Sequence, residues 1–126
     1  MGGVVTQNDV RRIALALPAT SEDTEAFRFF VDGRQFLWAW NERIDRRRRR
    51  IPNAEVIAAR VADEFEKQTL LEMDPAVFFT EPHYDGYPAV LVRLPVIDQE
   101  LLTRIVTGAW RTRAPKRLLR GPGAAA

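Results

Sequence analysis

The segment DPAVFFTEPHYDGYPAVLVRL, residues 74–94, decides how the rest of the chain is interpreted. It joins a helix-like end, an aromatic pair, a turn rich in Pro, Gly and Tyr that holds the only histidine, and a dense apolar run. Residues 89–94 are apolar at every position except Arg93, a pattern typical of a central strand that is covered on both faces. This one segment therefore predicts both a part of the core and a candidate site.

A helix and an acidic connector are predicted at the start of the chain. Thr6 and Asp9 are suited to begin a helix whose apolar residues recur three and four positions apart as far as Leu17. Pro18 ends this pattern, because proline cannot continue a helix. The polar residues 19–25 then predict an acidic connector.

A β-hairpin with an aromatic face follows, because the apolar period changes to two. The dipeptide Asp32-Gly33 is a two-residue turn signal, since glycine adopts positive φ without strain. A third strand of weaker alternation is expected at residues 55–61. The residues predicted on the aromatic face are Phe27, Phe29 and Val31 on the first strand and Phe36, Trp38 and Trp40 on the second.

Two further helices are predicted from their capping residues. Asp63 with Glu66 three positions later resembles a capping box, and Asp98 precedes a run with one apolar stripe that ends at Trp110. The order of helix, hairpin, strand, helix, strand and helix describes an α+β two-layer sandwich with an antiparallel sheet. The aromatic residues expected to anchor its core are Phe27, Phe29, Phe36, Trp38, Trp40, Phe65 and Trp110.

Length and composition favour one domain. With 126 residues, of which 46% are hydrophobic, the chain has enough apolar material for a single core, with ordered residues at about 6–118 and a flexible tail at 119–126. The absence of cysteine excludes disulfides and thiolate sites and fits a reducing compartment. No apolar run is long enough to span a membrane, so we expect a cytoplasmic protein without membrane contact.

The net charge of +2 conceals two basic blocks. Residues 43–62 sum to +5 and residues 101–126 to +6, whereas residues 63–85 between them sum to −6. Guanidinium groups pair with phosphate, so DNA is a candidate partner and its binding would be non-specific. The alternative is that these arginines only confer solubility. The candidate contacts are Arg43, Arg46, Arg47, Arg48, Arg49, Arg50, Arg104, Arg111, Arg113, Lys116 and Arg117.

A second candidate site is a pocket for a small molecule or peptide around the His-Tyr-Asp-Gly-Tyr turn. Aromatic walls with a few polar groups are typical of such sites, but they are equally typical of a core. If the tryptophan rings were sealed from solvent, the pocket would be excluded. Its predicted residues are Trp38, Trp40, His83, Tyr84, Tyr87 and Arg93.

Catalysis, metals and cofactors have little support in the sequence. His83, two residues from Asp85, has the chemistry of a general base, but no nucleophile motif accompanies it, so a structural role for His83 and Tyr84 in fastening the turn is favoured. The carboxylates at residues 63–74 have helix-surface spacing without a cation-binding loop. No glycine-rich phosphate motif is present. We therefore expect a non-enzymatic protein with no metal site and no cofactor.

The run Phe78-Phe79, Pro82-His83-Tyr84 and the apolar strand ending near Arg93 resembles the MmcQ/YjbR family of small bacterial proteins, which are labelled DNA-binding. The resemblance covers about residues 7–118 and includes Ala109-Trp110-Arg111 and Ala114-Pro115. It implies a frataxin-like (CyaY-like, YjbR-like) sandwich with terminal helices on one face of the sheet and two hairpin wings, and a DNA-binding role. The five consecutive arginines are not part of this resemblance.

Overall fold

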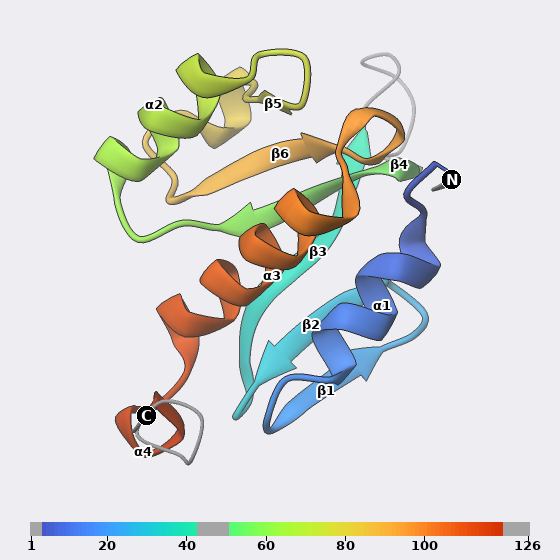
Figure 1. Cartoon of the computed structure of the whole chain (residues 1–126), viewed down its shortest axis with the longest axis vertical. Helices are drawn as coiled ribbons and strands as arrows, with labels where there is room; N and C mark the ends of the chain where they lie inside the picture. The colour runs from blue at the N-terminus through green and yellow to red at the C-terminus, as the bar shows by residue number, and fades with distance from the viewer. Residues whose placement is uncertain (1–3, 43–50, 120–126) are drawn as a thin grey trace.

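The computed structural model describes residues 4–42 and 51–119, with side chains at 4–41 and 53–119 (Figure 1). Within these residues six strands form one antiparallel sheet in the spatial order β1-β2-β3-β4-β6-β5. Every pair of neighbouring strands is antiparallel. The strands are β1 (Thr20–Asp23), β2 (Arg28–Val31), β3 (Arg34–Glu42), β4 (Ile51–Arg60), β5 (Phe78–Phe79) and β6 (Ala89–Arg93).

Helices cover one face of this sheet. Figure 1 shows α1 (Gln7–Leu15) and the long α3 (Gln99–Arg113) lying across it, and these two helices also contact each other. The helix α2 (Glu64–Met73) contacts β5 and β6 at the other end of the sheet. The short elements are the 3-10 helices η1 (Pro82–Tyr84) and η2 (Leu94–Val96) and the helix α4 (Lys116–Leu119). The predicted α+β sandwich with terminal helices on one face is therefore confirmed.

The main core lies between the sheet and the terminal helices. Phe29 and Phe36 are fully buried in it, as are Leu102 and Val106 on the inner stripe of α3. Each such side chain stabilises the fold by about 2–3 kcal/mol before entropy is subtracted. The indole Nε1 of Trp110 donates a 2.9 Å hydrogen bond to the carbonyl of Pro18, which fixes the end of α3 to the segment after α1.

The predicted hairpin turn is present between β2 and β3. Asp32 and Gly33 have φ angles of 51° and 81°, the left-handed conformation that a type I′ turn requires at both central positions. The predicted central strand is also correct, because β6 lies between β4 and β5 and its residues from Ala89 to Val92 are all buried.

The predicted aromatic face is wrong, because β3 contains a β-bulge at Phe36. In the register of β2 and β3, Phe29 pairs with Leu37 and Phe30 pairs with Gln35, so Phe36 is an extra residue. Phe36 and Leu37 are therefore both buried in the main core. Beyond the bulge the alternation is reversed, and Trp38 lies on the opposite face of the sheet from the terminal helices.

Two other expectations are corrected. Part of the predicted connector is the strand β1, which pairs with β2; its Glu22 side chain is held by Nε of Arg11 at 2.9 Å. Phe65 is not a core anchor, because its residue is 81% exposed. The inner side of α2 is formed by Lys67, Leu70 and Leu71 instead. The predicted flexible tail lies outside the described residues except for Leu119, which ends α4.

Candidate functional site: an aromatic pocket

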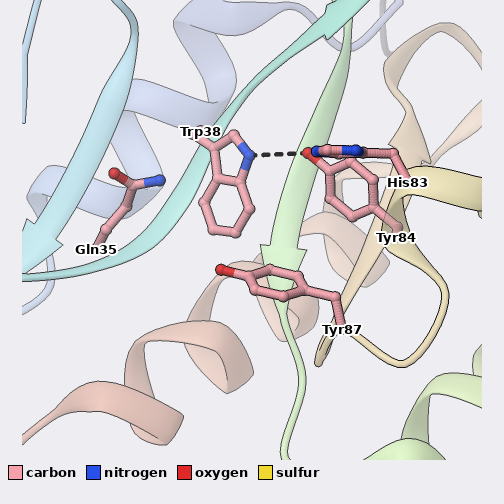
Figure 2. Close-up of a pocket in the computed structure, with 5 residues that line it drawn as sticks. All are labelled: Gln35, Trp38, His83, Tyr84 and Tyr87. Atoms are coloured by element: carbon pink, nitrogen blue, oxygen red, sulfur yellow. Dashed lines mark hydrogen bonds between the residues drawn. The ribbon is translucent and has the colours of Figure 1, made fainter.

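Because of the bulge, Trp38 lies in a pocket on the face of the sheet that the terminal helices leave uncovered. The pocket has a volume of about 310 Å³ and opens to solvent. Figure 2 shows its lining, which comes from one strand and one turn: Gln35 and Trp38 of β3, His83 and Tyr84 of η1, and Tyr87 of the following loop. Segments about 50 positions apart in the sequence therefore meet here.

Three aromatic rings of the pocket are held at steep angles to one another. The rings of Trp38 and Tyr87 are 6.3 Å apart at 74°, and those of Tyr84 and Tyr87 are 5.9 Å apart at 90°. Trp38 Nε1 donates a 3.1 Å hydrogen bond to the hydroxyl oxygen of Tyr84, the dashed line in Figure 2. These edge-to-face contacts and the hydrogen bond fix the walls of the pocket before any ligand enters.

Lys67 of α2 forms hydrogen bonds with the turn that carries Tyr84 and Tyr87. Its ammonium donates hydrogen bonds to the backbone carbonyls of Tyr84 at 2.6 Å and Tyr87 at 2.9 Å, and the residue is only 1% exposed. A buried ammonium needs such partners, because an unpaired charge in a protein interior is strongly unfavourable. Lys67 therefore ties both tyrosines of the pocket to α2.

Arg60, the last residue of β4, adds a second positive charge beside the pocket. Its guanidinium carbon lies 5.6 Å from the centre of the Tyr87 ring, a cation–π contact. Tyr87 itself is 43% exposed. The pocket thus has aromatic walls, neutral polar groups and positive charge at its edge.

Four of the six predicted pocket residues come together. Trp40 and Arg93 instead form a neighbouring cluster with Phe79, in which the Trp40 and Phe79 rings are 5.6 Å apart and the Arg93 guanidinium carbon is 4.0 Å from the Phe79 ring centre. Arg93 also donates hydrogen bonds to the carbonyls of Pro75 and Ala76. Trp38 and Trp40 are both only partly buried, so the condition that would have excluded a pocket is not met.

Three residues of the site were missed by the sequence analysis. Gln35 precedes the bulge and was not recognised as a neighbour of the turn, although its position two residues after Gly33 places it early on β3. Lys67 was not considered, because only the carboxylates of residues 63–74 were assigned to a helix surface. Arg60 was counted only in the basic block. No local signal identifies Lys67, because its two carbonyl partners lie 17 and 20 residues away.

His83 lies exposed at the rim of the pocket. Its ring packs against Tyr84, with 5.9 Å between the ring centres, and among the described residues nothing forms a hydrogen bond with it. The fastening role predicted for His83 and Tyr84 belongs to Tyr84. Within residues 4–42 and 51–119 no group of three or more His, Asp or Glu side chains lies close enough to hold a metal ion. None of the described helices is long and apolar enough to cross a membrane.

The predicted nucleic-acid contacts are only partly described. Arg43, Arg46, Arg47, Arg48, Arg49 and Arg50 lie outside the described residues. Arg104 and Arg111 are exposed on α3 and Lys116 is exposed on α4, whereas Arg113 is half-buried. Arg117 forms a 3.0 Å ion pair with Asp32 in the turn between β2 and β3.

Mycobacterial proteins are similar to this chain over nearly its whole length. Uncharacterized protein Rv2570 of Mycobacterium tuberculosis (strain H37Rv) is 40% identical over 124 residues, which cover 92% of this chain and 94% of the relative. The chain belongs to the same family as this protein. Uncharacterized protein MT2646 of M. tuberculosis (strain CDC 1551) and uncharacterized protein Mb2600 of M. bovis are family members with the same identity and coverage. No family model matches the sequence.

The fold is also similar to a solved structure, protein DR2400 of Deinococcus radiodurans, which has a DUF419 domain. The TM-score is 0.61, and the match covers 95% of this chain and 82% of the other. The sequences are 19% identical, so the likeness concerns the fold alone. This chain therefore shares the α+β two-layer fold of DR2400.

Proposed function

We propose that this protein is a non-enzymatic binding module whose pocket takes a small planar ligand or an aromatic side chain of a peptide. The observation that carries the proposal is the preformed set of rings: Trp38, Tyr84 and Tyr87 surround an open space of about 310 Å³ and are fixed by hydrogen bonds from Trp38 and Lys67. Small-molecule sites have volumes of about 300–1,000 Å³ and mainly aromatic or apolar walls with a few polar groups. The pocket is at the lower end of this range, so it suits one ring system.

A binding role is favoured over catalysis by what surrounds His83. General acid–base catalysis requires a partner that orients the imidazole and a reacting group within about 3 Å. Among the described residues no carboxylate forms a hydrogen bond with the His83 ring, and its contacts are with Tyr84 and the open pocket. His83 is therefore assigned the role of a polar contact for the ligand.

The test is saturation-transfer NMR with planar probes (indole, phenol, adenine, nicotinamide) and with cyclohexanol as an aliphatic comparison. The planar probes are expected to receive magnetisation from the wild-type protein and to lose most of it in a Trp38→Leu variant. Trp40→Leu is the matched control, because Trp40 lies two residues along the same strand and outside the pocket lining. Equal signals for both variants, or equal signals for cyclohexanol and the planar probes, would contradict the proposal.

The chain is further proposed to belong to the MmcQ/YjbR family, in which the DUF419 domain is placed. Two observations support this: the Phe-Phe, Pro-His-Tyr and apolar-strand motif of residues 74–94, and the fold shared with DR2400. Because the MmcQ/YjbR family is labelled DNA-binding, DNA binding is a second candidate function. The charge distribution favours it independently, because residues 43–62 carry +5 and residues 101–126 carry +6.

Salt dependence tests this second candidate. If about five phosphates are neutralised, the logarithm of the binding constant falls with the logarithm of salt concentration with a slope of about −4 to −5. Replacing Arg46, Arg47, Arg48, Arg49 and Arg50 with Ser is expected to flatten the slope. A second variant replaces the C-terminal set (Arg104, Arg111, Arg113, Lys116 and Arg117) with Ser and is expected to flatten the slope as well, because these residues are also candidate contacts. An unchanged affinity and slope in the first variant would remove the arginine run from DNA binding.

A further inference from the structure

The chemistry of the pocket lining selects one class of planar ligand. Among the described residues the lining contains no carboxylate and no ammonium. The Trp38 indole N–H and the Tyr84 hydroxyl bond to each other. The other polar groups of the lining are the amide of Gln35, the imidazole of His83 and the hydroxyl of Tyr87, and each of these is able both to donate and to accept a hydrogen bond. A ligand that matches them is a flat ring whose edge carries donors and acceptors side by side, as a heterocycle does and a purely hydrocarbon ring does not.

Two positive charges lie next to the pocket. The Lys67 ammonium lies behind the turn, bound to the carbonyls of Tyr84 and Tyr87, and the Arg60 guanidinium already covers the Tyr87 ring at 5.6 Å. A cationic ligand is disfavoured here, because like charges repel and the aromatic face that would attract it has a cation in place. An anionic substituent next to the ring is favoured.

A second guanidinium lies on the opposite side of Trp38. Arg28 of β2 is the direct cross-strand partner of Trp38, so the two side chains stand on the same face of the sheet. Arg28 forms an ion pair with Asp23, and 45% of its side chain remains exposed. The partner on the other side of Trp38 is Ala58, which is fully buried and adds no charge. Arg28 on β2 and Arg60 on β4 therefore lie on the two strands next to β3, and the Arg28 guanidinium also lies over the Phe30 ring at 5.9 Å.

We infer that the pocket takes a nucleobase whose sugar carries a phosphate, with the base among Trp38, Tyr84 and Tyr87 and the phosphate at Arg60 or Arg28. This inference rests on the proposed binding function. A base offers two aromatic faces and an edge of adjacent donors and acceptors, and the Gln35 amide is able to bind such an edge at two points. Guanidinium groups suit phosphate because their planar N–H groups bind two of its oxygens together.

The same ligand chemistry has two sources, a free nucleotide and an unpaired base of a single strand. Paired bases are excluded from the pocket, because in a duplex both faces of each base are covered by its neighbours. Stacking of unpaired bases on aromatic side chains beside a positive surface is the usual mode of single-strand binding. Because the pocket opens to solvent, the sugar and phosphate are able to extend out of it, where a strand is able to continue.

The test measures the affinity of the full chain for four probes by calorimetry at low salt: adenosine, adenosine monophosphate, a 12-nucleotide single-stranded DNA and the duplex of the same sequence. Adenosine monophosphate is expected to bind more tightly than adenosine, and at least one of the variants Arg60→Gln and Arg28→Gln is expected to remove most of this difference. Trp38→Leu is expected to weaken binding of the monophosphate and the single strand about tenfold. Duplex affinity is expected to stay within about twofold, because the duplex does not use the pocket.

Two further variants distinguish a loss of ligand contacts from a loss of folded protein. Gln35→Leu removes the amide from the lining without removing a ring that packs on the sheet. This variant is expected to weaken binding of the single strand and of the monophosphate by about as much as Trp38→Leu does. Trp40→Leu is the control and is expected to leave all four affinities unchanged. Amide–proton NMR spectra that match the wild type show that each variant is folded.

The possible outcomes separate the two proposals. A single strand that binds much more tightly than the monophosphate identifies single-stranded nucleic acid as the ligand, and equal affinities identify the free nucleotide. Indole or phenol binding that depends on Trp38, without binding of any nucleotide or strand, overturns this inference and leaves the proposed function in place. Absence of binding by every planar probe overturns both. Single-strand binding that is the same in the Trp38→Leu and Trp40→Leu variants also overturns the inference, because the strand then binds elsewhere.

Discussion

Trp38 and Tyr84, which are 46 residues apart in the sequence, are joined by a 3.1 Å hydrogen bond from the indole Nε1 to the phenol oxygen. This bond connects the strand β3 to η1 on the face of the sheet that the terminal helices do not cover. Tyr84 is 8% exposed and Tyr87, three residues later, is 43% exposed. One tyrosine of the turn therefore anchors it, and the other remains available to a ligand.

Replacement of Tyr84 with Phe tests the anchoring role. The variant removes the acceptor of the Trp38 hydrogen bond, and the free energy of unfolding is expected to fall by about 1 kcal/mol, the usual contribution of a partly buried hydrogen bond. Urea denaturation measures it. Tyr87→Phe is the matched control and is expected to change stability by less than about 0.5 kcal/mol, because it alters an exposed residue. Equal losses in the two variants would show that Tyr84 does not hold the turn.

Lys67→Met tests whether the buried ammonium holds the turn. Methionine fills a similar space but leaves the carbonyls of Tyr84 and Tyr87 without their donor, so the unfolding free energy is expected to fall by about 2 kcal/mol. Hydrogen exchange of the backbone amides at residues 84–89 is expected to accelerate more than exchange in α3. The control is Gln68→Met, the next residue on the helix, which is exposed and is expected to leave both measurements unchanged. Unaltered exchange at residues 84–89 in the Lys67 variant would contradict the proposed tie to α2.

The start of α1 is expected to make the stability of the fold depend on pH. The Thr6 backbone N–H donates a 2.9 Å hydrogen bond to the Asp9 carboxylate, and this bond, with a further one from the Gln99 side chain, lowers the Asp9 pKa. Because the folded-state pKa lies below the unfolded value of about 3.9, the carboxylate stabilises the fold above pH 3.9 and this contribution is lost as pH falls through the lower folded-state value.

Asp9→Asn measures this contribution. At pH 7 the variant is expected to be less stable than the wild type by up to about 1 kcal/mol, the range for a helix cap. The difference between the two proteins is expected to shrink as pH falls below about 3.9, because the wild-type carboxylate then becomes neutral too. A difference that stays constant from pH 7 to pH 2 would show that the charge of Asp9 has no such role.

Phe65 and Phe29 provide a test of which aromatic side chains form the core. Phe65 is 81% exposed on α2, so Phe65→Ser is expected to change the unfolding free energy by less than about 0.5 kcal/mol. Phe29 is fully buried in the main core, so Phe29→Ala is expected to lower it by about 3–5 kcal/mol. Urea denaturation of both variants under one set of conditions measures the two changes in unfolding free energy. A large loss at Phe65 would mean that its side chain is buried in solution.

Features with a local cause were predictable from the sequence. Asp32-Gly33 encodes the hairpin turn, because a type I′ turn demands positive φ at both positions. Asp63 and Asp98 encode helix starts, and their carboxylates accept hydrogen bonds from the amides of Glu66 at 2.9 Å and Leu101 at 2.7 Å. Since these interactions span three residues, they follow from short stretches of sequence.

Features that depend on distant partners were not predictable. The bulge at Phe36 reverses the alternation of β3 and separates Trp38 from the core, and period-two analysis assumes that no such residue intervenes. Lys67 is buried because the carbonyls of a distant turn receive its hydrogen bonds. The run at residues 46–50 lies outside the described residues, so its role in DNA binding stays a prediction.

The most direct test of the pocket follows the three tryptophan indole N–H signals by NMR while adenosine monophosphate or indole is added. We expect the signal of Trp38 to shift in a saturable way with at least one of these ligands. The signals of Trp40, which is outside the lining, and of Trp110 on α3, whose indole N–H donates a hydrogen bond to the Pro18 carbonyl, are expected to stay in place. A Trp38 signal that does not move, or equal movement of all three signals, would contradict a ligand site among Trp38, Tyr84 and Tyr87.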